Sequence, residues 1–276
     1  MALITIARGT LSAATELAGR LASTLGYRVV SREDVYEAAK AYGIKQTGLG
    51  DLGFLDQRPP SLWYPFYDKR RWYLACFQAA LMDAALSGDL VYVGHLGQLL
   101  FSTYRRVLRV RLAAPDRYRV EALARERGMT EAQAQSYIRD MDERRLRWSQ
   151  FLYGLDWRDP ELYDLVLNPE RLRVETMTEA VARIARSAEL QPTSLDRERL
   201  RNLRLVAVGR AALLRSARTR LLDVTLEADA TRGRLRVYGV ASSMSIETGE
   251  RDLRSVLARI PDLNGIDVML EEDPFR

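Results

Sequence analysis

Short apolar runs separated by segments with helical spacing dominate the first 190 residues. The runs predict strands at 3–6, 28–31, 90–93, 107–112 and 163–167. Between them apolar residues recur every three or four positions, as they do in the segment that ends at Gly26. Strands that alternate with helices favour an α/β fold, here a three-layer arrangement with a parallel five-stranded sheet.

Start and stop signals place the helices of this region. Ser31 is a candidate N-cap, and Thr130 with Gln133 forms a predicted capping box for a long helix that runs to about Tyr153. The other predicted helices cover 68–86, 116–127 and 174–189. Residues 43–62 are rich in glycine and proline, so we expect a mobile loop that could carry a substrate lid.

The alternation breaks near 191–194, and a smaller unit follows. Its pattern predicts a helix, two strands joined by a short turn, a second helix and a last strand, at 196–217, 223–228, 233–238, 247–259 and 266–270. This α+β order differs from that of the first region. The sequence therefore predicts two domains, 1–190 and 195–276.

The first strand, turn and helix have the layout of a phosphate-binding loop. A helix N-terminus offers unpaired N–H groups and a positive dipole end to a phosphate. Measured against Gly-x-x-x-x-Gly-Lys-Ser/Thr, positions 8, 13, 14 and 15 carry Arg, Ala, Ala and Thr, so only Thr15 matches. An ordinary strand–turn–helix of an α/β domain remains the alternative explanation.

Composition limits the chemistry. The chain has one cysteine, Cys76, and one histidine, His95, which excludes an intrachain disulfide, a cysteine-based zinc site and a histidine-rich metal site; we predict no protein metal site. No apolar run approaches the roughly 20 residues of a membrane span, and we see no signal peptide, so we expect a cytoplasmic protein without an integral membrane segment.

Lysine and arginine total 42 against 37 acidic residues, a net charge of +5. An arginine-rich protein could bind an anionic surface or a nucleic acid. Many of the arginines stand near acidic residues at helical spacing, which is typical of a solvated helix face. Binding to an anionic surface therefore ranks last among the functions considered, and we do not expect a nucleic-acid partner.

Several spaced segments resemble the cytidylate kinase-like branch of the P-loop nucleoside monophosphate kinases. They occur in the family's order, and the likeness extends over the whole first domain. The segments are Ile4-Thr5-Ile6-Ala7-Arg8, Leu25-Gly26-Tyr27, Ser31-Arg32-Glu33, Val93-Gly94-His95, Met129-Thr130-Glu131-Ala132, Asp142-Glu143-Arg144-Arg145, Gly154-Leu155-Asp156-Trp157 and Tyr163-Asp164-Leu165-Val166-Leu167-Asn168.

The resemblance implies ATP- and magnesium-dependent phosphoryl transfer to a nucleoside monophosphate such as CMP or dCMP. It implies lid arginines among Arg139, Arg144, Arg145 and Arg147, of which Arg139 and Arg144 are the candidate catalytic residues. It assigns Arg32 and His95 to the acceptor site. It assigns phosphate binding to Arg8, Gly9, Thr10, Ser12, Ala13, Ala14 and Thr15.

The sequence departs from that family at two places. Where the family has Gly-Ser-Gly-Gly, this chain has Leu11-Ser12-Ala13-Ala14. Residues with a Cβ replace three glycines, and we expect these Cβ atoms to intrude on the phosphates. His95 replaces an arginine, and only its protonation would partly restore the charge. We therefore expect a nucleotide- or anion-binding regulatory protein, a pseudokinase in which transfer is weak or absent. The alternative is an active kinase in which Arg8 supplies the charge.

The C-terminal region is similar to a BON domain. The similarity rests on Leu235-Arg236-Val237-Tyr238-Gly239-Val240 and on 261–268. It implies binding of a ligand or contacts with a protein partner or a second copy of the chain, and no catalysis. The expected partner of the whole protein is a nucleotide or another phosphorylated small molecule.

Overall fold

The computed structural model describes residues 2–8, 13–44, 65–101, 103–241, 245–261 and 263–272. They form two compact units. The first draws on 1–34, 47–59 and 87–193, and the second on 35–46, 60–86 and 194–276. Two segments of the predicted first domain thus group with the second unit, and the domain limits of 1–190 and 195–276 stay a prediction.

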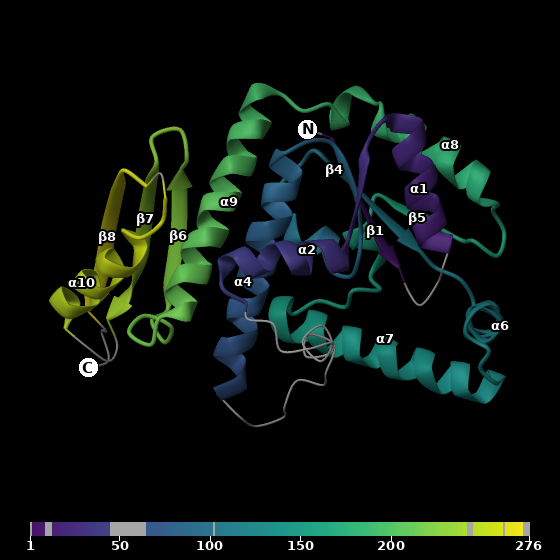
Figure 1. Cartoon of the computed structure of the whole chain (residues 1–276), viewed down its shortest axis with the longest axis horizontal. Helices are drawn as coiled ribbons and strands as arrows, with labels where there is room; N and C mark the ends of the chain where they lie inside the picture. The colour runs from purple at the N-terminus through teal and green to yellow at the C-terminus, as the bar shows by residue number, and fades with distance from the viewer. Residues whose placement is uncertain are drawn as a thin grey trace. The chain divides into compact units, whose positions relative to one another are not determined.

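A five-stranded parallel sheet organises the first unit (Figure 1). Its order is β2-β3-β1-β4-β5, so β1 is central. The strands are β1 (Leu3–Arg8), β2 (Arg28–Ser31), β3 (Leu90–Val93), β4 (Val107–Leu112) and β5 (Leu165–Leu167). This confirms the predicted parallel sheet. The fifth strand is shorter than predicted, because Tyr163 ends a 3-10 turn, η2 (Pro160–Leu162), instead of joining the ladder.

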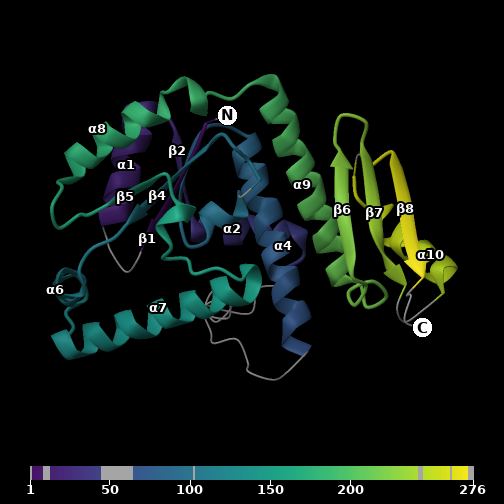
Figure 2. The ribbon, with the colours of Figure 1, turned by 180° about the vertical axis from the view of Figure 1, so that it is seen from behind.

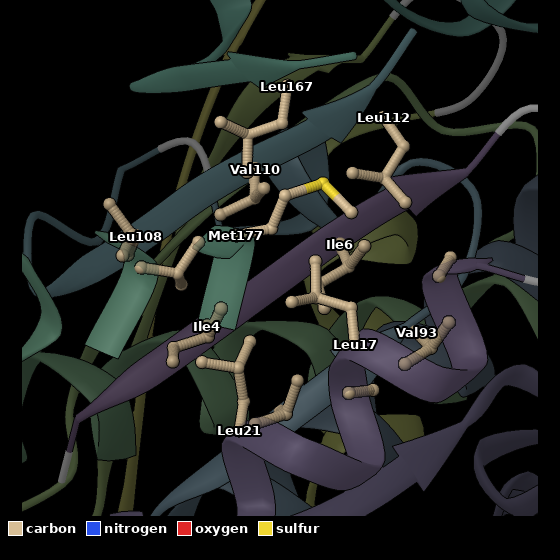
Figure 3. Close-up of a cluster of buried hydrophobic side chains, with 14 of the residues drawn as sticks. Ile4, Ile6, Leu17, Leu21, Val93, Leu108, Val110, Leu112, Leu167 and Met177 are labelled. Atoms are coloured by element: carbon tan, nitrogen blue, oxygen red, sulfur yellow. The ribbon is translucent and has the colours of Figure 1, made fainter. Parts of the chain in front are cut away.

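One face of this sheet is covered by α1 (Ala13–Leu25) and α8 (Val174–Ala185), which lie side by side in both views (Figures 1 and 2). Alternate residues of the strands point toward them, as Ile4 and Ile6 of β1 do. Figure 3 shows these side chains meeting Leu17 and Met177 in a dry cluster. Burial of apolar surface, at about 25 cal/mol per Å², makes this cluster a stabilising feature of the unit.

The opposite face carries different side chains. The strand residues that point away from α1, among them Thr5 and Tyr92, meet the short helix α5 (Gly97–Leu100). An ideal Cβ built on Gly97 would lie 2.7 Å from the Tyr92 ring and 3.1 Å from Thr5. The chain can pass this close to the sheet because residue 97 has no side chain.

Two antiparallel helices follow β4 in the first unit. They are α6 (Asp116–Arg127) and α7 (Glu131–Tyr153). The capping box predicted for α7 is confirmed: the Gln133 N–H donates to Thr130 Oγ1 at 3.3 Å, and the Thr130 N–H donates to Gln133 Oε1 at 2.9 Å. Gly128, with φ of 64°, ends α6 in the left-handed conformation that glycine adopts at low cost.

The last helix of this unit is shorter than the predicted 174–189. It ends at Ala185, where the Gln191 side chain donates to the free carbonyl of Ala185 at 3.1 Å. A short 3-10 helix, η3 (Ala188–Leu190), then returns Leu190 to the core cluster. Of the predicted loop at 43–62, residues 45–62 lie outside the described part of the chain.

The second unit contains the predicted α-β-β-α-β order. Its elements are α9 (Ser194–Arg215), β6 (Val224–Asp229), β7 (Arg234–Ala241), α10 (Ile246–Leu257) and β8 (Gly265–Glu272). β7 is central, antiparallel to β6 and parallel to β8. Leucines from both helices and from the strands form its core. This confirms a separate small α+β sheet, whereas the likeness to a BON domain remains a prediction.

Two earlier segments belong to the second unit as well. The long helix α4 (Pro65–Leu86) packs along α9, and η1 (Lys40–Tyr42) follows α2 (Arg32–Ala39), whose first turn groups with the first unit. Cys76 of α4 is fully buried, and its thiol donates to the Tyr42 carbonyl at 3.7 Å. Burial raises the pKa of this thiol to about 12. Among the described helices, none is long and apolar enough to span a membrane.

The close approach of Gly94 to the Tyr92 ring can be tested by a stability measurement. A Cβ at Gly94 would lie 2.2 Å from the Tyr92 hydroxyl, and Tyr92 is fully buried, so its ring has no room to shift. We expect Gly94→Ala to lower the free energy of unfolding by about 2 kcal/mol, as overpacked cores do. Urea titration followed by circular dichroism measures the change.

The matched control is Gly19→Ala. Gly19 lies within α1 and has no atom within 4 Å of its ideal Cβ, so alanine should stabilise the helix by about 0.5–1 kcal/mol. Equal effects of the two substitutions would contradict the proposed crowding at Gly94.

Candidate functional site

The parallel strands of the first unit end at one edge of the sheet. Arg8, the last residue of β1, is in register with Leu112 of β4, and Ser31 of β2 is in register with Val93 of β3. Ligands of such sheets bind beyond the carboxyl ends of the strands. The segments that leave this edge therefore form the candidate site.

The loop after β3 is held tightly in place. The Gly94 N–H donates to the Ile6 carbonyl at 3.2 Å, and the Tyr92 hydroxyl lies 3.5 Å from the His95 carbonyl. Leu96 has φ of 65°, the only positive φ at a described residue other than glycine. This conformation costs on the order of 1 kcal/mol and recurs at functional sites. The strained backbone at Leu96 is thus next to His95 in the loop.

His95 is half-buried with both ring nitrogens covered, and its ring lies edge-on to the Trp157 ring with centroids 5.6 Å apart. Neither ring nitrogen makes a hydrogen bond of good geometry with a described residue, although the Arg145 backbone lies near enough to interact with the ring. Burial first, then the positive charges of Arg145 and Arg32, lower the pKa of this imidazole well below 6.5. His95 is therefore neutral near pH 7, so protonation does not restore the charge of the arginine expected here.

Two guanidinium groups gather on the same tryptophan. The Arg111 guanidinium carbon lies 5.1 Å from the Trp157 ring centroid, and that of Arg145 lies 6.0 Å from it. Arg111 is the penultimate residue of β4 and also approaches the Tyr163 ring, at 5.8 Å. Cation–π contacts of this kind fix the position of the charges, and Arg111 also donates from Nη1 to the Arg158 carbonyl.

Several buried polar atoms around this tryptophan have no partner in the described structure. They are both ring nitrogens of His95, Nε1 of Trp157, Nε of Arg111 and Oε1 of Gln98. Gln98 is connected to the group because its amide donates to the Tyr163 hydroxyl at 2.9 Å, and that hydroxyl donates to the Trp157 carbonyl at 2.6 Å. Buried polar groups are normally hydrogen-bonded, so this concentration of unpartnered donors and acceptors is what a ligand site requires.

An ion-pair network joins the site to the α6–α7 hairpin. Arg119 of α6 donates to both carboxylate oxygens of Asp142 in α7, at 2.7 and 2.9 Å. The same carboxylate lies 4.0 Å from Arg145. A bidentate pair with only 11% of the arginine side chain exposed holds geometry well. Asp142 thus links Arg145 to the Arg119 ion pair.

The two predicted catalytic arginines lie elsewhere on α7. Arg139 is exposed, and Arg144 is 37% exposed and pairs with Asp140 at 3.6 Å along the helix surface. The contact with Trp157 belongs instead to the neighbouring Arg145. Of the predicted acceptor residues, His95 is in the cluster, and Arg32 opens α2 near enough for its charge to act on the His95 ring.

The predicted phosphate loop is only partly described. Gly9, Thr10, Leu11 and Ser12 lie outside the described residues, and Arg8 ends β1. Helix α1 begins at Ala13, and Ala14 is fully buried in the core cluster. Thr15 is exposed. Position 14, where a Walker A loop has its lysine, is therefore part of the packed interior.

Some of these residues could be found from sequence and others could not. Arg111 sits at the end of a predicted strand, the signal that could have selected it. Trp157 lies in one of the segments that resemble the family, whereas Gln98 carries no comparable signal. No group of three or more histidine, cysteine or acidic side chains in the described ranges is arranged to hold a metal ion.

Comparison with known proteins finds the following similarities. A cytidylate kinase from Ignicoccus hospitalis is 28% identical over 187 residues, which are 67% of this chain and 99% of that protein. An uncharacterized protein from Eubacterium ventriosum has a similar fold, with a TM-score of 0.51 and 18% identity over 67% of this chain and 97% of its own. A gluconokinase from Sinorhizobium meliloti aligns with a TM-score of 0.42 and 16% identity, over 68% of this chain and 94% of its own.

The match to a family model covers more than half of the chain. It runs from residue 3 to residue 171, and so includes the parallel sheet. It also includes the whole His95–Trp157 cluster, which consists of His95, Gln98, Arg111, Arg145, Trp157 and Tyr163. The chain belongs to the cytidylate kinase-like family.

Proposed function

We propose that this protein binds a nucleoside monophosphate, or a closely related phosphorylated small molecule, at the His95–Trp157 cluster and transfers phosphoryl groups weakly or not at all. The observation that carries the proposal is the gathering of Arg111, Arg145 and unpartnered buried polar atoms around one tryptophan. Guanidinium groups suit a phosphate, and the neutral His95 and Gln98 suit the polar edge of a base or sugar.

Weak transfer is supported by two features of the same unit. His95 is neutral where the family has an arginine, so one fixed positive charge is missing from the acceptor side. Ala14 is a core residue, so no cation can stand at that position without unpacking α1. Phosphoryl transfer depends mainly on positioning and on stabilising charge, and the loss of one such contact typically costs about 10²–10³ in rate.

ATP and magnesium belong to this proposal only if transfer occurs. Magnesium in kinase sites is held largely by nucleotide phosphates, which fits a chain whose described residues offer no metal cluster. The chain's own residues would then bind the acceptor, orient it through Arg111 and Arg145, and exclude water beneath α7. A regulatory role follows if the nucleotide is bound and not consumed.

An active kinase with an atypical loop is the alternative. It is favoured by the position of Arg145, whose guanidinium lies near both Asp142 and Trp157. A guanidinium placed by its neighbours is suited to binding a phosphate. In that case Arg8 would supply the charge that lysine normally gives. Contacts of the C-terminal unit with a partner protein or a second copy remain a prediction.

The binding site is tested by Arg145→Gln and Arg111→Gln. Each removes a charged donor, so we expect the dissociation constant for CMP to rise about tenfold or more in isothermal titration calorimetry. Arg125→Gln is the matched control, because Arg125 is exposed on α6 and has no ion pair with a described residue. CMP affinity that is unchanged in both site variants, or lowered equally in the control, would refute the site.

Catalysis is tested with a coupled assay for ATP-dependent phosphorylation of CMP. We expect turnover at least 10²-fold below the roughly 10 s⁻¹ that is ordinary for enzymes. Replacing Leu11 and Ala13 by glycine should raise it if these side chains block the phosphates, and Ala14 is left unchanged because it packs in the core cluster. Ordinary turnover in the wild-type chain that is lost in Arg8→Ala would instead establish the alternative.

The neutral state of His95 has a pH signature. The folded pKa is below 6.5, so the unfolded chain binds this proton more readily, and stability falls as pH drops below about 6.5. The slope approaches about 1.4 kcal/mol per pH unit for one proton. His95 is the only histidine, so His95→Gln should flatten urea-unfolding free energies between pH 7 and 5.5. An NMR titration of the folded chain with a midpoint at or above 6.5 would contradict this.

A further inference from the structure

A cavity of about 730 Å³ lies in the second unit and is lined by residues of that unit alone. Its walls come from one side of α9, from the end of α10 and the turn that follows it, and from η1. Val208 of α9 and Val256 and Ile260 beside α10 give it an apolar floor. Pockets that bind small molecules have volumes of about 300–1,000 Å³ and mostly apolar linings with a few polar groups.

The polar groups of this cavity are mainly arginines. Arg204, Arg215, Arg218 and Arg259 all line it, and none of the described lining residues is acidic. Tyr42, Ser216 and Ser255 add hydroxyl groups. Four guanidinium groups converging on one cavity create a positive potential that must be balanced from within the protein or from outside it.

Two of the four charges are balanced internally. Arg204 forms a short ion pair with Asp83 of α4, and Asp83 also accepts a short hydrogen bond from the Tyr42 hydroxyl. Arg218 lies 3.8 Å from Asp252 of α10. Arg215 and Arg259 are exposed residues that line the cavity. Neither has an ion pair with a described residue. Two positive charges therefore remain for a ligand.

Arg215 is also held in position by the backbone. Its guanidinium packs on Gly43, where an ideal Cβ would lie 2.8 Å from Nη1 of Arg215. Gly43 has φ of 103°, a conformation that favours glycine, so the absence of a side chain serves both the turn and the arginine. A guanidinium packed in this way loses less freedom when it binds a ligand than a freely rotating one.

We propose that this cavity binds a small organic phosphate, with its phosphate on Arg215 and Arg259 and its less polar part on the floor formed by Val208, Val256 and Ile260. Guanidinium groups bind phosphate through two parallel N–H donors, which favours phosphate over a simple halide ion. The inference does not depend on the function proposed for the first unit, because it uses residues of the second unit alone.

The test uses the full chain and glycerol 3-phosphate as the probe in isothermal titration calorimetry. We expect the double variant Arg215→Gln/Arg259→Gln to weaken binding at least tenfold, since each arginine contributes a charge-assisted contact. The matched control is Arg236→Gln/Arg251→Gln, which removes the same net charge from exposed arginines that do not line the cavity and have no ion pair with a described residue. It should change the affinity less than twofold.

Hydrogen exchange locates the binding. Protection by the probe should appear in 204–218 and 255–261 and be lost in the Arg215/Arg259 variant. Equal weakening in both double variants, or protection confined to the first unit, would overturn the proposal. The CMP affinity of the variants, measured in parallel, separates this outcome from a failure of the nucleotide site.

A second arm identifies the source of the phosphate. Vesicles of phosphatidylcholine with and without phosphatidic acid are sedimented with the wild-type chain and with both double variants. Binding that needs phosphatidic acid and both cavity arginines, with no binding of glycerol 3-phosphate, identifies a lipid headgroup. Binding of the soluble probe alone identifies a free metabolite. Binding of neither overturns the site.

Discussion

Parallel pairing of β1 with its two neighbours is the constraint on which the nucleotide-site geometry depends. It brings the ends of β2, β3 and β4 to one edge, so that His95 and Arg111 both reach the Trp157 ring and Arg32 acts on the His95 charge, although these residues are far apart in the sequence. The dry cluster beneath α1 and α8 holds the register. A slip of one residue would turn Arg111 into that cluster, at the cost of burying an unpaired charge.

Arginine has two different uses in this chain. On the surface of α7 it forms pairs with acids three or four residues away, as Arg144 and Arg147 do, each worth a few tenths of a kcal/mol. In the two candidate sites its position is fixed by neighbouring groups: Trp157 and Asp142 for Arg145, and Gly43 for Arg215. Position and local balance, more than the net charge of the chain, separate the two uses.

Much of the fold could be predicted from sequence because it depends on local patterns. The apolar runs gave the five strands, and Thr130 with Gln133 gave the start of α7. The residues of the site were harder to predict. Arg144 and Arg145 differ by a rotation of about 100° around α7, and only the packing against Trp157 shows that Arg145 belongs to the site. Likewise, no pattern in the sequence says that the segment around Tyr42 lines a cavity with residues after 200.

The buried thiol of Cys76 has a practical consequence. With its pKa raised to about 12 and its sulfur enclosed between α4 and η1, it stays protonated and sheltered from reagents at neutral pH. Because it is the sole cysteine, a thiol engineered at an exposed position would react first with maleimide dyes or spin labels. The native chain can thus serve directly as the background for site-specific labelling.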